Sequence, residues 1–447
     1  MSASMRLDEV PDASASVHAI PHKRSRRFLL SRGSSFWAAA AIAFLAFAAN
    51  AAVSPLYRVY QAQLGFSTTT LTLLFTVYIV VLLVTLLFFG SLSDHVGRRP
   101  VLLAGLALSA VGCAVFLSAD GVGPLFAARA LQGVAVGLIS GAASAGLLDL
   151  RPTSAVAPLV SSVAPAGGQA LGAIGASVLA QYAPAPTHFV WWLLLGAFIA
   201  GIFAVAAMPE PGARSPGRPS SLRPHISVPP EARGAFAVAT PCLVAVWALA
   251  GFYLSLGPSL AAQQTHSDNL TWGGVLILLF TGLGAASSVA LAKREPSRVM
   301  LGGCLVLIAG AVVTFSSIDT GAAALFFVGT AVAGLGFGPA FMGAYRVVVA
   351  FAVPSDRAGL ITAVYIVSYL ATGIPAVIGG IATSRYGLRE TALVYSLVVA
   401  ALAAVAVILL VSRIRGAERA TRTNCPDPPP GPGTVPPCPP CPPCPPA

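Results

Sequence analysis

The sequence carries very little charge for its length. Only 9% of the 447 residues are Asp, Glu, Lys or Arg, whereas 56% are hydrophobic and the mean hydropathy is +0.82. A soluble domain has about 25% charged residues. So few charges cannot cover the outside of a water-soluble fold. This excludes a soluble enzyme, a disordered chain and a protein that binds nucleic acid through a basic face, and it leaves lipid as the surroundings.

The hydrophobic residues lie in twelve long runs. A helix needs roughly 20 apolar residues to cross a hydrocarbon core of about 30 Å, and the run from Leu71 to Phe89 holds no charge at all. The runs are apolar on all sides, which favours helices over the alternating strands of a barrel. The sequence therefore predicts an all-α membrane protein with spans at about 36–56, 69–91, 101–119, 124–148, 156–180, 189–208, 236–261, 271–292, 298–318, 322–345, 358–383 and 390–412.

The positive charges lie mainly on one side of these spans. The loops and termini of that side carry 21 of the 26 Lys and Arg residues, and the opposite loops carry 3. Since cytoplasmic loops have an excess of Lys and Arg, we expect a multi-pass protein of the inner (plasma) membrane with both termini in the cytoplasm. The basic stretch from Lys23 to Arg32, followed by an alanine-rich run, also permits a cleavable signal peptide in place of the first span.

The chain divides into two similar halves. Residues 209–234 are rich in Pro, Ser and Arg and read as a cytoplasmic linker between residues 36–208 and 235–412, each with six spans. Asp94 and Lys293 each begin the charged loop between the second and third spans of their half. This indicates a duplication and two pseudo-symmetric six-helix bundles with a site between them. Residues 1–35 and 413–447 are expected to be disordered tails, the first basic and the second rich in Pro and Cys.

Two motifs resemble a known family. The loop from Gly90 to Pro100 reads Gly-Ser-Leu-Ser-Asp-His-Val-Gly-Arg-Arg-Pro, and the fourth span carries Arg129, Gln132, Gly133 and Gly137. Both resemble signatures of the major facilitator superfamily, closest in style to its drug and metabolite efflux permeases. The resemblance implies secondary transport by alternating access. A phosphate-binding loop of the ATPase type is absent from the sequence.

The loop motif contains the groups needed for a conformational latch. Two arginines beside an aspartate in a glycine-flanked turn can form charge-assisted hydrogen bonds to nearby helix ends. A latch forms such bonds in one conformation and breaks them in the other. Alternatively, the charges only set the topology, a role that requires neither Asp94 nor the glycines. The candidate latch residues are Gly90, Asp94, Gly97, Arg98, Arg99 and, as a partner at the end of the fourth span, Asp149.

A third family motif, which is associated with antiport, is incomplete. Gly168 and Gly172 keep its spacing on the fifth span, but Ala173 stands where the antiporter pattern has Pro. Close packing through small residues is expected to survive this change, and protons remain a candidate coupling ion.

The predicted spans contain few polar groups, and none has an Asp or Glu in its interior. A buried cation needs an acidic partner, so this absence favours neutral or anionic substrates. Arg129 can pair with such a substrate, or with water and backbone carbonyls. Packing or interhelical hydrogen bonding is the alternative for most of the other groups, and Arg346 is expected to reach the lipid headgroups. The candidates for substrate or coupling contacts are Asn50, Arg129, Gln132, Gln169, Tyr365 and Tyr369.

These observations predict a transporter rather than an enzyme. The six histidines all lie in predicted loops or tails, which disfavours a membrane-embedded catalytic site. We expect a monomeric exporter of small organic molecules in the lipid bilayer, without a cofactor, a metal or a nucleic-acid partner. The alternatives are a sugar or metabolite uptake permease and, in another class, a membrane-embedded enzyme or receptor. Trp37, Trp191, Trp192 and Trp272 are expected to anchor span ends at the membrane interfaces.

Overall fold

The computed structural model describes residues 30–154, 156–212, 226–351 and 357–423. Within them, twelve helical segments are long and apolar enough to cross a membrane, which confirms the predicted number, and no strand occurs. The elements are α1 Arg32–Leu64, α2 Thr68–Phe89, α3 Leu92–Val96, α4 Arg98–Leu117, α5 Val122–Leu150, α6 Val156–Tyr182, α7 Phe189–Ala206, α8 Pro230–Ser255, α9 Gly257–Thr265, α10 Thr271–Ile277, the π-turn η2 Leu278–Gly282, α11 Leu283–Leu291, α12 Pro296–Thr320, α13 Ala323–Val349, α14 Arg357–Tyr386 and α15 Leu388–Thr423.

The first helix is longer than predicted at both ends. Ser31 caps its start, accepting a hydrogen bond from the Ser34 amide at 3.1 Å. The helix then continues past Pro55 and ends at Gly65, whose φ is +65°. The hydropathy signal fades near residue 56, but Tyr57 and Tyr60 beyond it remain buried against neighbouring helices. Packing against neighbouring helices therefore stabilises the helix beyond the end of the apolar run.

The predicted linker and C-terminal tail are also partly helical. α8 begins at Pro230, inside the segment 209–234, and α15 continues beyond residue 412 to Thr423. Hydropathy marks only the part of a helix that lipid surrounds, whereas Arg, Ala and Glu favour helix in water as well. The rest of these segments and most of the N-terminal tail (1–29, 213–225 and 424–447) lie outside the described residues.

Two crossings of the second half are interrupted. The predicted span 236–261 consists of two helices, α8 and α9, which meet at Leu256, and Pro258 stands in the first turn of α9, where a missing N–H costs little. The next crossing is α10, η2 and α11 in series, with a π-turn in its middle.

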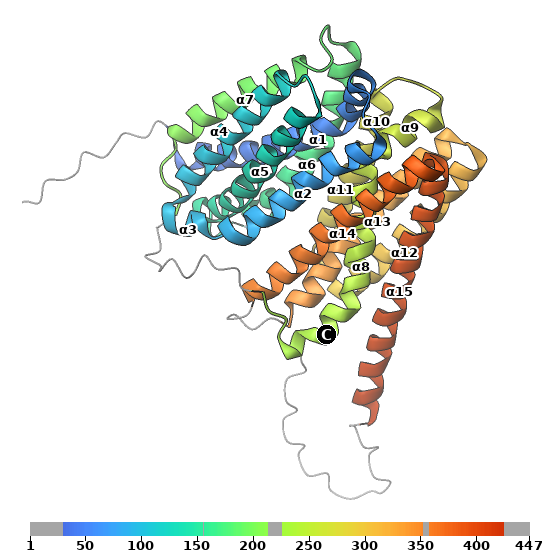
Figure 1. The fold of residues 1–447 in the computed structure, drawn as a ribbon. Coiled ribbons are helices and arrows are strands. Elements are labelled where there is room, and N and C mark those ends of the chain that lie inside the picture. The colour runs from blue at the N-terminus through green and yellow to red at the C-terminus, as the bar shows by residue number, and fades with distance from the viewer. Residues whose placement is uncertain (1–29, 155, 213–225, 352–356, 424–447) are drawn as a thin grey trace, which may run out of the picture.

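The chain forms two bundles, α1–α7 (the N half) and α8–α15 (the C half). Figure 1 shows them splayed like the arms of a V. We call the side that carries Ser31 and Thr423 the tail side, and the opposite one the far side. In the N half α1 packs on α6, and in the C half α12 packs on α13.

The two halves meet at their far-side and middle parts. Helix α2 packs on α14, and α6 packs on α10 and η2. Six hydrogen bonds or ion pairs join the halves in this region, and the helices diverge towards the tail side (Figure 1). These contacts join Arg58 to Asp268 (3.2 Å), Thr69 to Ser384 (3.0 Å), Thr69 to Gly380 (3.5 Å), Thr76 to Gly373 (3.3 Å), Gln181 to Leu270 (2.8 Å) and Tyr182 to Asn269 (3.4 Å).

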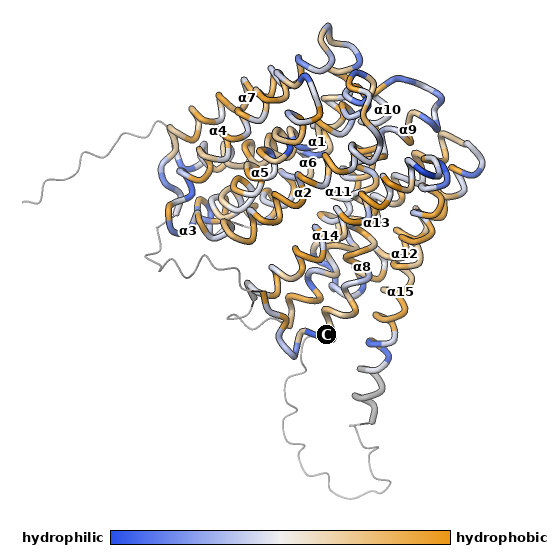
Figure 2. The backbone as a smooth tube through the Cα atoms, in the orientation of Figure 1, coloured by the Kyte–Doolittle hydropathy of each residue, from blue (hydrophilic) through white to orange (hydrophobic). Residues whose placement is uncertain are grey.

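Hydrophobic residues predominate along the helices of both halves (Figure 2). Phe203 is 70% exposed and Ile408 is 66% exposed, as expected for residues that contact lipid. Of the four tryptophans predicted to anchor span ends, Trp191 does not. Its ring is fully buried, stacks on Phe116 and donates a hydrogen bond to Tyr60 at 2.7 Å. Its neighbour Trp192 on the next face of α7 takes the exposed position.

Candidate functional site

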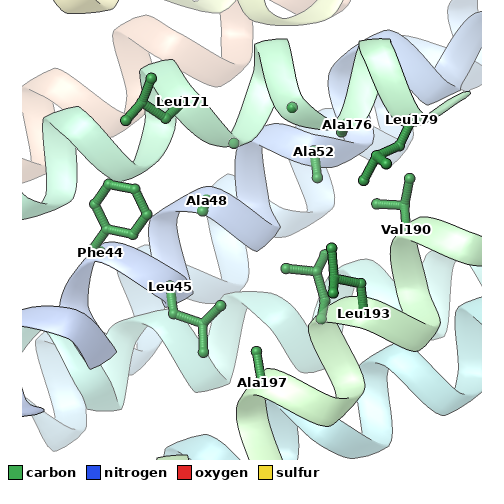
Figure 3. A pocket seen from close by; sticks show the side chains of 13 residues that line it. Phe44, Leu45, Ala48, Ala52, Leu171, Ala176, Leu179, Val190, Leu193 and Ala197 are labelled. Carbon is green, nitrogen blue, oxygen red and sulfur yellow. The ribbon is translucent and has the colours of Figure 1, made fainter. Parts of the chain in front are cut away.

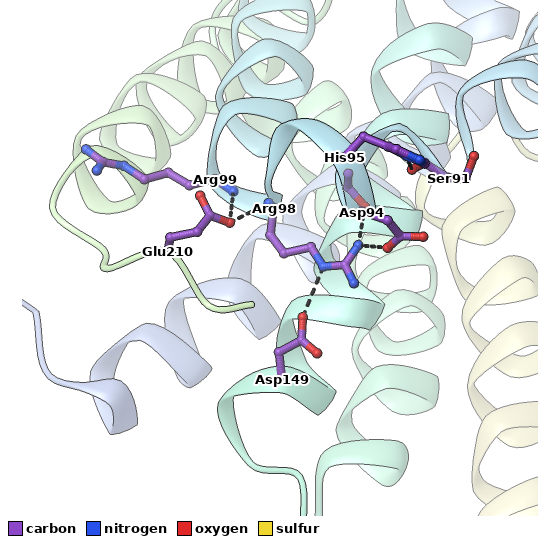
Figure 4. A network of polar contacts seen from close by, with 8 residues as sticks. Ser91, Asp94, His95, Arg98, Arg99, Asp149 and Glu210 are labelled. Carbon is purple, nitrogen blue, oxygen red and sulfur yellow. Dashed lines mark hydrogen bonds and ion pairs between the residues drawn. The ribbon is translucent and has the colours of Figure 1, made fainter. Parts of the chain in front are cut away.

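A polar network occupies the tail side of the N half, where α3 joins α4 (Figure 4). Arg98, the first residue of α4, donates from Nε to Asp149 at 3.0 Å. Its Nη1 donates to Asp94 and, at 2.7 Å, to Ser93. The Arg98 side chain is 14% exposed, against 46% for Asp94 and 32% for Asp149. One guanidinium thus joins α3, α4 and the end of α5.

Glu210 is a member of this network that the sequence analysis missed. One of its carboxylate oxygens accepts the backbone N–H groups of Arg98 (2.5 Å) and Arg99 (3.2 Å). The first N–H groups of a helix have no partner within the helix, so an anion is favourable there. Gly97 has a φ of +109°, and a Cβ at this position would lie 2.9 Å from Glu210. Glycine therefore allows both the turn and the close approach of the carboxylate.

The remaining contacts tie further helix ends to this point. Arg99 donates to the Ala206 carbonyl at the end of α7, and Arg32 of α1 donates to the Asp149 carbonyl at 3.2 Å. Gly90 ends α2 directly before α3. In the described part of the chain, these contacts all stay within the N half and the segment that follows it.

The C half has a different arrangement at the corresponding place. Arg346, near the end of α13, donates to the carbonyls of Ala292 (3.0 Å) and Arg294 (3.1 Å) where α11 ends. From the sequence, the Arg346 side chain is expected to reach lipid headgroups. In the structure Arg346 binds a helix C-terminus, where the unpaired carbonyls and the helix dipole favour a cation.

A second polar site lies inside the N half. It brings together three of the predicted candidates, Arg129, Asn50 and Gln132. Arg129 is 1% exposed, and its Nη1 donates to Asn50 at 3.1 Å and to Gln132 at 2.7 Å. Its Nε donates to the Leu74 carbonyl at 3.4 Å, and its guanidinium carbon lies 4.2 Å from the centre of the Tyr78 ring.

Arg129 therefore has only uncharged partners. Among the described residues no carboxylate forms an ion pair with it. The hydroxyl of Tyr57, whose ring centre lies 6.0 Å from the guanidinium carbon, is buried without a hydrogen-bond partner. A buried charge is usually paired, and a buried hydroxyl is usually hydrogen-bonded. The site thus combines an unbalanced positive charge with an unused polar group. Sequence reasoning missed Tyr57, which stands beside Pro55 at the end of the apolar run.

The other candidates lie elsewhere. Gln169 on α6 is half-buried and shares a face with the buried Ala173 and Ala176, opposite the exposed Leu171. Tyr365 and Tyr369 belong to the C half, where their ring centres lie 6.2 Å apart on α14. The structure therefore separates the six substrate or coupling candidates into three places.

The structure also contains two apolar cavities. The larger, of about 910 Å³, lies between the halves, with Phe44 and Val163 on one wall and Gly282 and Val289 on the other. The smaller, of about 280 Å³, lies among α1, α6 and α7 (Figure 3). None of the predicted latch or substrate residues lines either cavity.

The smaller cavity adjoins a close helix contact. A Cβ at Gly168 or Gly172 of α6 would overlap backbone atoms of Phe44 or Ala48 of α1. The glycines of the incomplete antiport motif therefore allow the two backbones to touch, as small residues do at helix interfaces in membranes.

Comparison with known proteins identifies the family. Residues 39–365 match the Major Facilitator Superfamily. The chain belongs to this superfamily. Its two six-helix halves are the superfamily fold, and the chain is a multi-pass membrane protein.

Similar superfamily members include multidrug transporters. Multidrug transporter MdfA of Yersinia pestis bv. Antiqua (strain Angola) is 31% identical over 175 residues, which are 37% of this chain and 41% of that protein. Multidrug resistance protein MdtL of Shewanella oneidensis is 36% identical over 103 residues (23% and 26%), and a uridine/deoxyuridine transporter of Lactococcus lactis is 36% identical over 95 residues (21% and 20%). These matches span less than half of each relative.

Solved structures support the fold alone. The human organic anion transporter MFSD10 aligns with a TM-score of 0.56 and 17% identity, over 85% of this chain and 100% of that one. A bacterial homologue of the human lysosomal transporter Spinster, in an inward-facing and occupied conformation, aligns with a TM-score of 0.66 and 14% identity, over 85% and 96%.

Proposed function

We propose that this chain exports small neutral or anionic organic molecules across a bacterial inner membrane by alternating access. The relatives named multidrug transporters support export. Arg129 supports a neutral or anionic substrate, because its hydrogen bonds all go to uncharged groups. A dication would meet this uncompensated guanidinium, whereas an anion or a hydrogen-bond acceptor would be attracted to it.

We propose further that the tail side faces the cytoplasm. The tail side carries most of the Lys and Arg residues, as cytoplasmic loops do. With this orientation the halves diverge towards the cytoplasm, and a substrate would be loaded from inside the cell. Impermeant labels attached before Phe36 and after Val411 are expected to react only in inside-out vesicles. Labels that react on opposite faces would contradict the orientation.

Transport is tested in inside-out vesicles, with and without a proton gradient, on a panel of neutral, anionic and cationic compounds. We expect ATP-independent uptake of neutral or anionic compounds into these vesicles, which corresponds to export from the cell. A gradient dependence would identify protons as the coupling ion. Transport of permanent dications at rates equal to those of anions would refute the substrate class.

The residue test compares Arg129→Met with Arg129→Lys. A charged hydrogen bond is worth about 1.5–3 kcal/mol, so Arg129→Met is expected to lower transport of an anion about tenfold or more. Arg129→Lys keeps the charge and should retain part of the activity. The matched control is Arg346→Met, which removes the other arginine placed within a span. Equal losses for anionic and neutral compounds, or equal effects of the two Met variants, would contradict the role of Arg129.

Metabolite transport in the uptake direction is the second candidate. It is favoured by the relative named as a uridine/deoxyuridine transporter. Uptake into right-side-out vesicles, with none into inside-out vesicles, would support this candidate over export.

We also propose that the Arg98 network, with Glu210 added to the predicted residues, acts as the latch. Its carboxylates Asp94 and Asp149 remain partly exposed at the ends where the halves diverge. They are therefore available for new partners when these ends approach each other.

A further inference from the structure

Six aromatic side chains of the C half form one continuous cluster, which we call the aromatic cluster. Trp247 of α8 lies at its centre, with Phe341 at 5.2 Å and Phe337 at 5.8 Å between ring centres, both edge-to-face. Tyr369 of α14 lies 6.3 Å from Trp247. The members are Trp247, Phe337, Phe341, Tyr345, Tyr365 and Tyr369.

The aromatic cluster lies at the edge of the core of the bundle. Phe337 contacts the fully buried Phe280 at 4.7 Å between ring centres, whereas the members of the aromatic cluster are all partly exposed and Tyr365 is 38% exposed. They do not face lipid. On α13, Phe337 and Phe341 lie on the side opposite Val328 and Leu335, two exposed residues in the body of that helix. The aromatic cluster therefore covers an inner surface of the C half.

Two hydrogen-bonding groups on this surface lack partners. The indole Nε1 of Trp247 and the hydroxyl of Ser368 are both buried and make no hydrogen bond. Ser368 lies one turn along α14 from Tyr365, on the same side of the helix. One turn further along, Gly251 of α8 lies against the Thr372 backbone, so Trp247 and Ser368 lie at the same level of two neighbouring helices.

Unpaired buried donors in native structures usually have a water, an ion or a ligand as their partner. We propose that the aromatic cluster binds an aromatic ring of the transported molecule, and that Trp247 Nε1 and Ser368 Oγ hydrogen-bond to an oxygen substituent of that ring. This inference deepens the proposed function and rests on it. It assigns the substrate to aromatic compounds with an oxygen acceptor, such as aryl carboxylates. Rings in edge-to-face contact attract each other beyond their burial, which a saturated ring of equal size does not reproduce.

The test measures the dissociation constants of two probes for the full-length chain in lipid nanodiscs. The probes are 1-naphthoate and its saturated counterpart decahydro-1-naphthoate, which have equal charge and similar size. We expect 1-naphthoate to bind about 2- to 10-fold more tightly. Trp247→Leu should abolish this preference. Trp247→Phe and Ser368→Ala should each weaken 1-naphthoate binding by about 2- to 10-fold, the effect of one hydrogen bond.

Trp192→Phe is the matched control, because it removes an indole N–H from a lipid-facing position, and it should leave both dissociation constants unchanged. Thermal unfolding of each variant separates loss of folding from loss of binding. Equal affinities for the two probes, no binding of either at millimolar concentration, or equal effects of Trp247→Phe and Trp192→Phe would overturn the inference. A Trp247 or Ser368 variant that changes the transport rate but leaves both dissociation constants unchanged would also overturn the inference. Such a result would indicate that the halves close on this surface and that the substrate does not bind there.

The outcome is separable from that of the proposed function. Binding with the expected pattern but without vesicle transport would retain the aromatic site and refute export. Vesicle transport without any preference for aromatic rings would refute the aromatic site alone.

Discussion

Replacement of Arg98 by Ala is expected to destabilise the N half. The side chain is 14% exposed and donates to Ser93, Asp94 and Asp149, so the substitution removes bonds that join three elements. Charged hydrogen bonds are worth about 1.5–3 kcal/mol when shielded, but exposed ion pairs contribute about 0–1 kcal/mol. Since both carboxylates are partly exposed, we expect a net loss of about 1–2 kcal/mol.

The assay is thermal unfolding of the purified chain, followed by intrinsic fluorescence. A loss of about 1 kcal/mol lowers the melting temperature of a domain of about 150–250 residues by roughly 2–4 °C, so Arg98→Ala should lower it by roughly 2–8 °C. A double-mutant cycle with Asp149→Ala should give a coupling energy of about 0.5–1.5 kcal/mol.

Arg298 provides the matched control for this prediction. It forms an ion pair with Glu295 at 2.8 Å, but its side chain is 85% exposed, and Arg298→Ala should cost less than about 0.5 kcal/mol. Equal shifts for Arg98→Ala and Arg298→Ala, or additive effects in the cycle, would refute the claim that the Arg98 network holds the helix ends together.

Three further substitutions test other contacts. Gly172→Leu should prevent the close contact of α6 with α1 and strongly reduce the yield of folded protein. Gly175→Leu is the control, because no atom of another helix lies within 4 Å of a Cβ at this position, and it should leave the yield unchanged. Gel filtration measures the folded yield of both variants. Glu210→Ala should cost about 0.5–2 kcal/mol of stability, as loss of a helix cap does, and Glu210→Gln, measured by the same melting assay, should cost less. Asp268→Asn should weaken the far-side ion pair with Arg58 and increase labelling of a cysteine introduced on the far side by impermeant maleimide, and unchanged labelling would contradict this.

The spans were predictable because each is a statement about local hydropathy, which lipid enforces residue by residue. The ends of the spans were not predictable where packing against other helices, or a helix that continues into water, extends them. Tyr57 and Tyr60 remain helical because they contact neighbours that are distant in sequence, and the break at Leu256, directly before Gly257 and Pro258, falls inside one predicted span.

The candidate sites were likewise predictable where the signal is local in the sequence and not where it depends on distant partners. The loop from Gly90 to Arg99 stood out because charges and glycines are rare between apolar runs. Glu210 did not, since its partner amides belong to a helix about a hundred positions earlier and its own surroundings resemble a linker. Arg346 was placed correctly at a helix end, but its partners are carbonyls of another helix, which carry no signature in the sequence.

The contact between α2 and α14 has a consequence for the rate and cost of switching. Thr69, Thr72 and Thr76 lie against Gly380 and Gly373, so the residues in contact there are small. Small side chains bury little area, and each hydrogen bond contributes only about 0.5–1.5 kcal/mol net. Under the proposed alternating access, this contact would add little to the energy difference between the two conformations, which leaves less for cargo binding to overcome.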